Sequence, residues 1–225
     1  MLRKFLQTAA GSRRPGADPS PPLTAGRWRT FWHTQFTDHG LLRYAWTNFH
    51  EVAPGVYRSN HPHPARLRAY RDMGIRTVLN LRGANDSPSY LQEQQACAAL
   101  GLELVNIKFT ARGLPRRERL MELFAAFDSI QRPFIMHCKS GADRAGLASV
   151  LYLLDQNVPL ERARYHLSTK FLHLKWTKTG VLDAFLDVYA DRLAKGPIPV
   201  RHWVRDEYDP DDVRQLFARR RGMTP

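Results

Sequence analysis

The sequence predicts an α/β fold in which a mainly parallel central sheet is flanked by helices. Short apolar segments alternate with longer segments of helical periodicity between about residues 56 and 193. Such alternation is typical of parallel strands joined by helices that cover the sheet. A chain of 225 residues, 43% of them hydrophobic, is also long enough to bury one sizeable core. We therefore expect one α/β domain with appended terminal segments.

Strands are expected where four short segments are rich in apolar and β-branched residues, and helices where apolar residues recur at helical spacing. In a sheet of this kind, the loops after the strands converge at the carboxyl edge, where ligands bind. The predicted strands are Val56–Arg58, Thr77–Leu81, Leu102–Phe109 and Phe134–His137. The predicted helices cover residues 64–73, 88–100, 115–131, 145–155, 159–168 and 178–193.

The terminal segments are expected to lie outside the central domain, which we place at residues 50–195. Residues 1–27 are rich in Pro, Gly, Ser and Arg, a composition that predicts disorder. Residues 28–49 carry seven aromatic side chains and should form an arm that packs on the domain. Residues 196–225 are expected to be an extension with a helix, because Asp209-Pro210 is a suitable N-cap and N1 pair.

Composition limits the class of protein. Two cysteines, Cys97 and Cys138, exclude a disulfide scaffold and fit a reducing compartment. No apolar segment approaches the roughly 18 residues of a membrane span, and the N-terminus lacks the apolar centre of a signal peptide. We therefore expect a cytoplasmic protein. No cofactor and no metal are expected, since His61-Pro62-His63 lacks companion ligands and is interpreted as a turn.

The net charge of +13 and the isoelectric point of about 10.3 favour polyanionic partners. Phosphorylated proteins and phosphoinositides fit this charge, and peripheral contact with an anionic membrane is compatible with it. Nucleic acid is not expected, because no base-stacking aromatic motif lies in a basic segment. The sequence indicates no particular oligomeric state.

The segment from Phe134 to Gly146 carries the strongest chemical signal. An apolar strand delivers His137 and Cys138 to a loop that ends at Arg144, and a helical segment follows. Such a loop can wrap around one phosphate, whose oxygens the backbone N–H groups and the helix N-terminus would bind. Arg144 can hold two phosphate oxygens with its forked guanidinium. The same positive field favours the thiolate of Cys138, a nucleophile aimed at phosphorus.

This segment resembles the phosphate-binding signature, His-Cys-x5-Arg between a strand and a helix, of the cysteine-dependent protein tyrosine and dual-specificity phosphatase superfamily. Residues 55–59 and 74–82 resemble it too, so that the resemblance covers about residues 50–192. It implies a phosphatase-like fold and hydrolysis of phosphotyrosine, phosphoserine/threonine or phosphoinositide through a phosphocysteine on Cys138. Arg144 would stabilise the transition state. The remaining phosphate-binding residues would be Lys139, Ser140, Gly141 and Ala142.

The proton donor for the leaving oxygen departs from the superfamily pattern. Most members carry an Asp on a separate loop before the Cys, but the matching segment, residues 107–115, contains no carboxylate. Asp143 is expected to be the acid instead, because the loop resembles those of myotubularin-type lipid phosphatases and of bacterial phosphatases with a Cys-x-x-Gly-x-Asp-Arg loop. Asp86 and Glu118 are the alternatives. Asp143 could also serve only to stabilise the loop, by pairing with Arg144 or a backbone N–H.

A second departure is Ala145, where members of the superfamily usually carry a Ser or Thr whose hydroxyl stabilises the departing thiolate. Hydrolysis of the phosphoenzyme could therefore be slow, unless Ser140 supplies a hydroxyl. An alternative function thus stays open: a low-turnover phosphate-recognition module, or pseudophosphatase, that binds phosphorylated or anionic lipid partners. Under either function, basic residues would suit a multiply phosphorylated or lipid-headgroup ligand. They are Arg112, Arg116, Arg117, Arg119, Arg162, Arg164, Lys170, Lys175 and Lys178.

Overall fold

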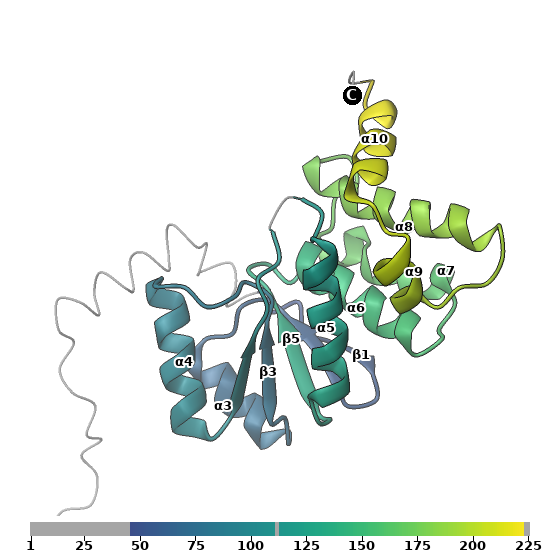
Figure 1. The fold of residues 1–225 in the computed structure, drawn as a ribbon. Coiled ribbons are helices and arrows are strands. Elements are labelled where there is room, and N and C mark those ends of the chain that lie inside the picture. The colour runs from purple at the N-terminus through teal and green to yellow at the C-terminus, as the bar shows by residue number, and fades with distance from the viewer. Residues whose placement is uncertain (1–45, 111–112, 223–225) are drawn as a thin grey trace, which may run out of the picture.

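A five-stranded sheet runs through the residues that the computed structural model describes, 46–110 and 113–222 (Figure 1). The strand order is β1-β2-β5-β3-β4, and every neighbouring pair is parallel except β1 and β2. This confirms the mainly parallel sheet, with β5 at its centre. The strands are β1 (His50–Ala53), β2 (Val56–Ser59), β3 (Thr77–Asn80), β4 (Glu103–Asn106) and β5 (Phe134–His137).

Helices cover both faces of the sheet, as expected. Ile135 of β5 packs in a small core with α3 and α4, whereas Phe134 and Met136 belong to a larger core with α5 and α6. The alternation follows from the two-residue period of a strand. The helices are α3 (Pro64–Asp72), α4 (Pro88–Leu100), α5 (Arg117–Ser129), α6 (Asp143–Asp155), α7 (Leu160–Ala163), α8 (Val181–Leu193), α9 (Val200–Asp206) and α10 (Pro210–Arg220). Short 3₁₀ turns are η2 (Arg164–His166), η3 (Thr169–Phe171) and η4 (Lys178–Gly180).

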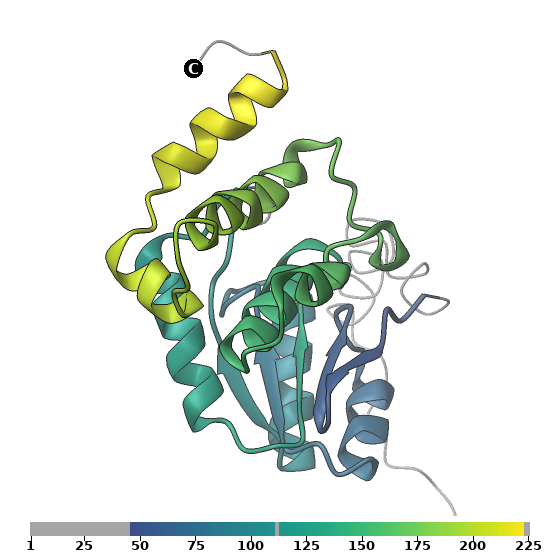
Figure 2. The same ribbon diagram turned by 90° about the vertical axis from the view of Figure 1, so that its right-hand side faces the viewer.

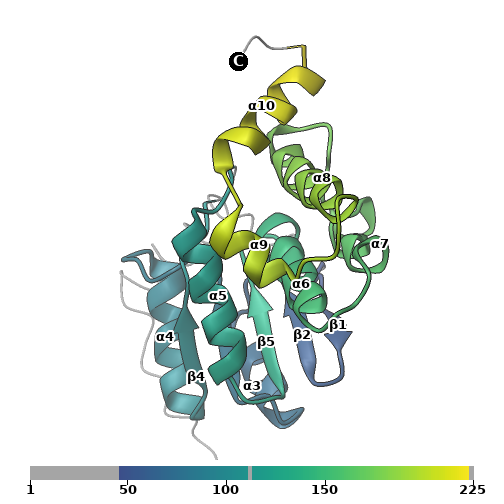
Figure 3. The ribbon, with the colours of Figure 1, turned by 45° about the vertical axis from the view of Figure 1, so that its right-hand side comes forward.

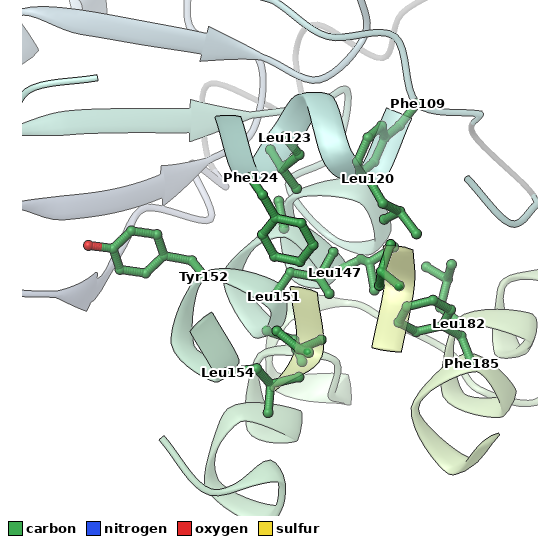
Figure 4. Packing of buried hydrophobic residues seen from close by; sticks show 14 of the residues in the cluster. Phe109, Leu120, Leu123, Phe124, Leu147, Leu151, Tyr152, Leu154, Leu182 and Phe185 are labelled. Atoms are coloured by element: carbon green, nitrogen blue, oxygen red, sulfur yellow. The ribbon is translucent and has the colours of Figure 1, made fainter. Parts of the chain in front are cut away.

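The helices after residue 180 gather at one end of the sheet, with α10 reaching furthest from it (Figure 2). They complete the larger core, part of which Figure 4 shows. Trp203 of α9 is 2% exposed, and its ring centroid lies 5.1 Å from that of Phe185 on α8. Tyr208 and Val213 are fully buried in the same core. The residues beyond 195 therefore pack as part of the domain's core, with α9 seated between α5 and α6 (Figure 3).

Several boundaries differ from the sequence predictions. The strand predicted at 102–109 spans only Glu103–Asn106, because its partner β3 ends at Asn80. The helix predicted at 159–168 is broken into α7 and η2, and the carbonyl of His166 accepts a hydrogen bond from Arg58. β1 and α9 were not predicted, since both are short and rich in polar residues.

The N-terminal predictions lie almost wholly outside the described residues. Of the aromatic arm, only Trp46 to Phe49 is described, and Phe49 stacks on Tyr57 and Tyr70. Within the described part of the chain, none of the helices has the length and apolarity needed to cross a bilayer.

We expect Trp203→Ala to lower the free energy of unfolding by about 3–5 kcal/mol, because it leaves a large cavity where α9 meets the core. His202→Ala, on the exposed face of the same helix, should change stability by less than about 0.5 kcal/mol. Urea unfolding of both variants measures the difference. Equal stabilities would mean that α9 contributes nothing to the core.

Candidate active site

The loop that follows β5, residues 138–142, lies at the carboxyl end of the central strand. Both neighbouring strands hold its start in place. The N–H of Leu81, after β3, donates to the carbonyl of His137 at 2.9 Å, and the N–H of His61, after β2, donates to that of Lys139 at 3.3 Å. The helix α6 begins directly after the loop, so the partial positive charge of its N-terminus faces any anion bound there.

The glycines of this segment are required by close backbone approach. Gly141 has φ of +75°, and a Cβ there would lie 2.8 Å from backbone atoms of Ser59 and Asn60. A Cβ on Gly146 would lie 2.8 Å from the carbonyl oxygen of His166. The loop is thus pressed against the end of β2, and α6 is pressed against η2.

Cys138 and Arg144, the two central residues of the signature, differ in burial. Cys138 is 2% exposed at the base of the loop. Arg144 is half-buried on the first turn of α6, and it forms no hydrogen bond or ion pair with another residue of the described ranges. Its guanidinium is therefore available to an anion bound above Cys138.

A buried arginine, Arg58 of β2, supports the loop from below. Its Nη1 donates to the carbonyl of His166 at 2.8 Å, and its Nη2 donates to the carbonyls of Gly141 and of Ala142, the latter at 3.2 Å. A trans peptide points its C=O and its N–H in opposite directions. The N–H groups of Ala142 and Asp143 therefore point away from Arg58, and that of Ala142 donates to Oγ of Ser140 at 3.4 Å.

Arg58 also brings a positive charge close to Cys138 and Asp143. Burial lowers its pKa to about 10, while the negative charges of Cys138 and Asp143 act in the opposite direction. The guanidinium thus keeps its proton at neutral pH even though it is fully buried.

Asp143 is held by a histidine from outside the loop. Its Oδ1 lies 2.7 Å from Nδ1 of His173, and Nε2 of the same ring lies 2.8 Å from Oδ2 of Asp183 on α8. Burial alone would lower the pKa of His173, but the hydrogen bonds to the two carboxylates raise it to about 9. At neutral pH, His173 is therefore an imidazolium between two carboxylates.

Comparison with known families agrees with this geometry. The family described as "DSP-PTPase phosphatase fused to NAD+ Kinase" matches residues 51–165, which is half of the chain and includes the whole loop. The chain belongs to this DSP-PTPase phosphatase family. The resemblance noted in the sequence is thereby confirmed, and the protein is a phosphatase-superfamily member. A search of curated proteins found no match.

Solved structures show the same phosphatase fold. The core catalytic domain of the PP-IP phosphatase SIW14 from S. cerevisiae has a TM-score of 0.52 and 18% identity, covering 67% of this chain and 92% of that one. TpbA from P. aeruginosa has a TM-score of 0.50 and 21% identity, covering 66% and 90%. Tk-PTP has a TM-score of 0.50 and 20% identity, covering 64% and 98%. At these identities the likeness concerns the fold.

The predicted loop residues lie together between β5 and α6, and the alternative acids lie on other segments. Asp143 lies beside Arg144 at the start of α6 and pairs with His173 rather than with Arg144. Asp86 and Glu118 are both exposed, one before α4 and the other on the first turn of α5. Neither is among the groups that hydrogen-bond to the loop within the described ranges.

Sequence reasoning missed Arg58, His173 and Glu93, which contact the loop or its flanks, and Asp183, which contacts His173. Arg58 was visible as a charged residue in an otherwise buried strand, which is the one available signal. His173 and Asp183 are ten positions apart on irregular and helical backbone, so no fixed spacing links them. Glu93 is a buried carboxylate on α4 in a segment that otherwise has ordinary helical composition.

Glu93 joins His61 and His137 in a buried cluster behind the loop. Its Oε1 lies 2.7 Å from His137 Nε2, and its Oε2 lies 3.8 Å from His61 Nδ1. Burial alone would raise the pKa of Glu93, but the charges of His137, His61 and Arg82 outweigh it and lower the pKa. His61 thus has companions that are distant in the sequence.

These three residues offer metal-ligand atoms within 4.8 Å of one another. However, Arg82 Nη1 lies 3.2 Å from His61 Nδ1, so a permanent cation already faces that nitrogen. Arg82 is accordingly a permanent cation that helps to balance the charge of Glu93. We interpret the cluster as a support for the His137–Cys138 backbone.

Arg58→Lys should reduce kcat/KM for an aryl phosphate by more than about tenfold, a loss of ~1.4 kcal/mol in transition-state stabilisation. Lysine keeps the charge, but its N–H groups radiate from one nitrogen and cannot reproduce the spacing of Nη1 and Nη2, which donate to the three carbonyls. Steady-state kinetics measures the effect, with Arg68→Lys on the exposed face of α3 as the control. Unchanged kinetics in Arg58→Lys would show that the carbonyl contacts do not shape the loop.

Proposed function

We propose that this protein hydrolyses phosphate monoesters through a phosphocysteine intermediate on Cys138. The observation that carries the proposal is the loop itself, which places a buried cysteine, Arg144 and the N-terminus of α6 within one short segment at the carboxyl end of β5. Membership of the phosphatase family supports the reaction class. The nucleophile, acid and transition-state roles follow from the chemistry of the residues.

The reaction would run in two displacements. In the first, Sγ of Cys138 forms a bond to phosphorus while the bond to the leaving oxygen breaks, and Asp143 gives that oxygen its proton. Arg144 and the loop N–H groups hold the three non-bridging oxygens. In the second, a water molecule attacks phosphorus and gives its proton to Asp143. The S–P bond breaks, the thiolate returns and inorganic phosphate leaves.

We further propose that the substrate is a phosphoinositide or phosphorylated protein approached from the side of residues 165–178. Asn48 links this segment to the loop, because its Nδ2 donates to the carbonyls of both Ser140 and Phe171. Exposed apolar and basic side chains together suit an anionic membrane surface. Those of the segment are Tyr165, Lys170, Leu172, Leu174, Lys175, Trp176 and Lys178. A panel of phosphopeptides and of phosphoinositides in vesicles distinguishes the two substrate classes.

The second candidate function, a low-turnover phosphate-recognition module, is favoured by Ala145. The residue is fully buried and offers no hydroxyl to the departing thiolate. The hydroxyl of Ser140 is engaged within the loop instead, because its Oγ accepts a hydrogen bond from the N–H of Ala142 at 3.4 Å. Rapid-mixing kinetics separates the candidates: sustained turnover indicates an enzyme, whereas a burst of one product equivalent that then stops indicates a trapped phosphoenzyme.

Cys138→Ser should abolish turnover while phosphate binding is retained, because a neutral hydroxyl is a poor nucleophile. Activity is measured by phosphate release and binding by calorimetry with inorganic phosphate. Cys97→Ala, in the core on the other face of the sheet, should keep activity. Residual turnover above ~1% of wild type, a loss of under about 2.7 kcal/mol, would contradict a phosphocysteine mechanism.

Asp143→Asn should slow hydrolysis of alkyl phosphates by ~10²–10⁴-fold, because their leaving oxygens need a proton. An activated aryl phosphate, whose leaving oxygen needs none, should be affected far less. The ratio of the two kcat/KM values is the measurement. If both substrates lost activity equally, Asp143 would have a structural role, and Asp86 and Glu118 would be substituted next.

A further inference from the structure

The proposed function leaves one requirement open, which is how Asp143 changes between acid and base. It must hold a proton in the first displacement and be a carboxylate in the second. In the structure, its Oδ1 is committed to His173, 2.7 Å away, so Oδ2 is left for the leaving oxygen or for water. Whatever charge His173 carries therefore acts directly on the reacting carboxyl group.

We infer that His173, held in place by Asp183, is a positioning residue that orients Asp143 and sets the pH range in which Asp143 can donate its proton. The inference rests on the proposed function, because it assigns a partner to the proposed acid. His173 and Asp183 do not belong to the loop, and both lie beyond residues 51–165, which the family match covers.

The backbone around His173 is shaped to aim this ring inward. His173 is 1% exposed, while its neighbours Leu172 and Leu174 are 51% and 37% exposed. Leu172 has φ of +63°, in the left-handed region that a residue other than glycine rarely adopts. The N–H of His173 donates to the carbonyl of Ser168 at 3.1 Å and holds the turn. An arrangement that exposes two leucines in order to bury one histidine indicates a role for the histidine.

The ring lies between Asp143 of α6 and Asp183 of α8. Arg58 of β2 interacts electrostatically with Asp143 and Cys138 from below the loop. Asp143 therefore faces two cations, the imidazolium of His173 and the guanidinium of Arg58, whereas Asp183 faces His173. Loss of the charge on either carboxylate would shift this balance and weaken the hold of His173 on its second proton.

The sign of the effect follows from the charge. A protonated His173 stabilises the carboxylate form of Asp143, so it favours the second displacement and restricts the first to lower pH. A neutral His173 can still donate from Nδ1 and orient Asp143, but it stabilises the carboxylate less. Asp143 would then keep its proton to higher pH. The rate of phosphoenzyme formation should then stay high to higher pH, so that the descending limb of its pH profile moves upward.

The test compares Asp183→Asn with Asp187→Asn in the full-length chain. Both carboxylates lie on α8 and are about equally exposed, at 19% and 20%, but Asp187 pairs with Arg164 and Arg220 instead of His173. The first readout is kcat/KM for an alkyl phosphate against pH, with an aryl phosphate measured in parallel. The second is the protonation of the His173 ring, followed by ¹⁵N NMR across the same pH range.

In Asp183→Asn, we expect the descending limb of the alkyl-phosphate profile to move to higher pH by about one unit, the usual size of such a charge effect. The aryl-phosphate profile should stay in place, and Asp187→Asn should match wild type for both substrates. The His173 ring should remain doubly protonated in wild type at pH 7 and should titrate at lower pH in Asp183→Asn. A limb that does not move, or a wild-type ring that is neutral at pH 7, overturns the inference.

Two further points keep the test decisive. If Asp183→Asn does not fold, His173→Asn takes its place, since its amide can still donate to Asp143 without a charge, and the same limb should move. The NMR result on wild type needs no variant. Failure of the proposed function gives a different pattern: Cys138→Ser would retain turnover, or Asp143→Asn would leave the alkyl-to-aryl ratio unchanged, whatever the His173 ring does.

Discussion

The buried guanidinium of Arg58 is the interaction on which the site depends. Its full burial costs desolvation energy, but its N–H groups donate hydrogen bonds to the carbonyls of Gly141, Ala142 and His166. Without it, these carbonyls would be buried and unpaired, at about 1–3 kcal/mol each. Phe171 packs on the guanidinium face, 4.3 Å from its ring centroid. One side chain thus ties together the loop, η2 and η3.

Charge is distributed in layers around this arginine. Below the loop, Arg58 faces Cys138, and beside it the imidazolium of His173 separates the two carboxylates of Asp143 and Asp183. At the rim, Arg144 is not engaged within the described residues. The charges of the buried residues are compensated by one another before an anion binds, whereas the charge of Arg144 at the rim is not. A dianionic phosphate therefore finds its complement at the rim, without displacing an existing ion pair.

The helices that follow the loop give this arrangement its rigidity. α6 is buried along most of its length, and α8 and α9 close over it through Phe185 and Trp203. α8 also carries Asp183, so the packing of the C-terminal helices sets the position of His173 and, through it, of Asp143. The packing of the core and the position of the proposed acid, Asp143, are in this way coupled.

The sequence alone determined the sheet, most of its helices and the loop with Cys138, Asp143 and Arg144. These features are local: a strand, a turn and a helix are encoded by periodicity and by glycines within a few residues, and a phosphate loop is closed by one short segment. The short, polar elements β1 and α9 could not be predicted, because their stability comes from strand pairing and burial rather than from a periodic pattern in their own sequence.

Only the tertiary structure decided which distant side chains support the loop. Arg58, Glu93 and His173 reach it from a strand, a helix and an irregular turn whose separations in the chain follow from intervening loop lengths, and no chemical period relates them. Their charges are tolerated inside the protein only because folding places a partner within hydrogen-bonding distance of each. A sequence records that such residues are present, but the fold decides which partners they meet.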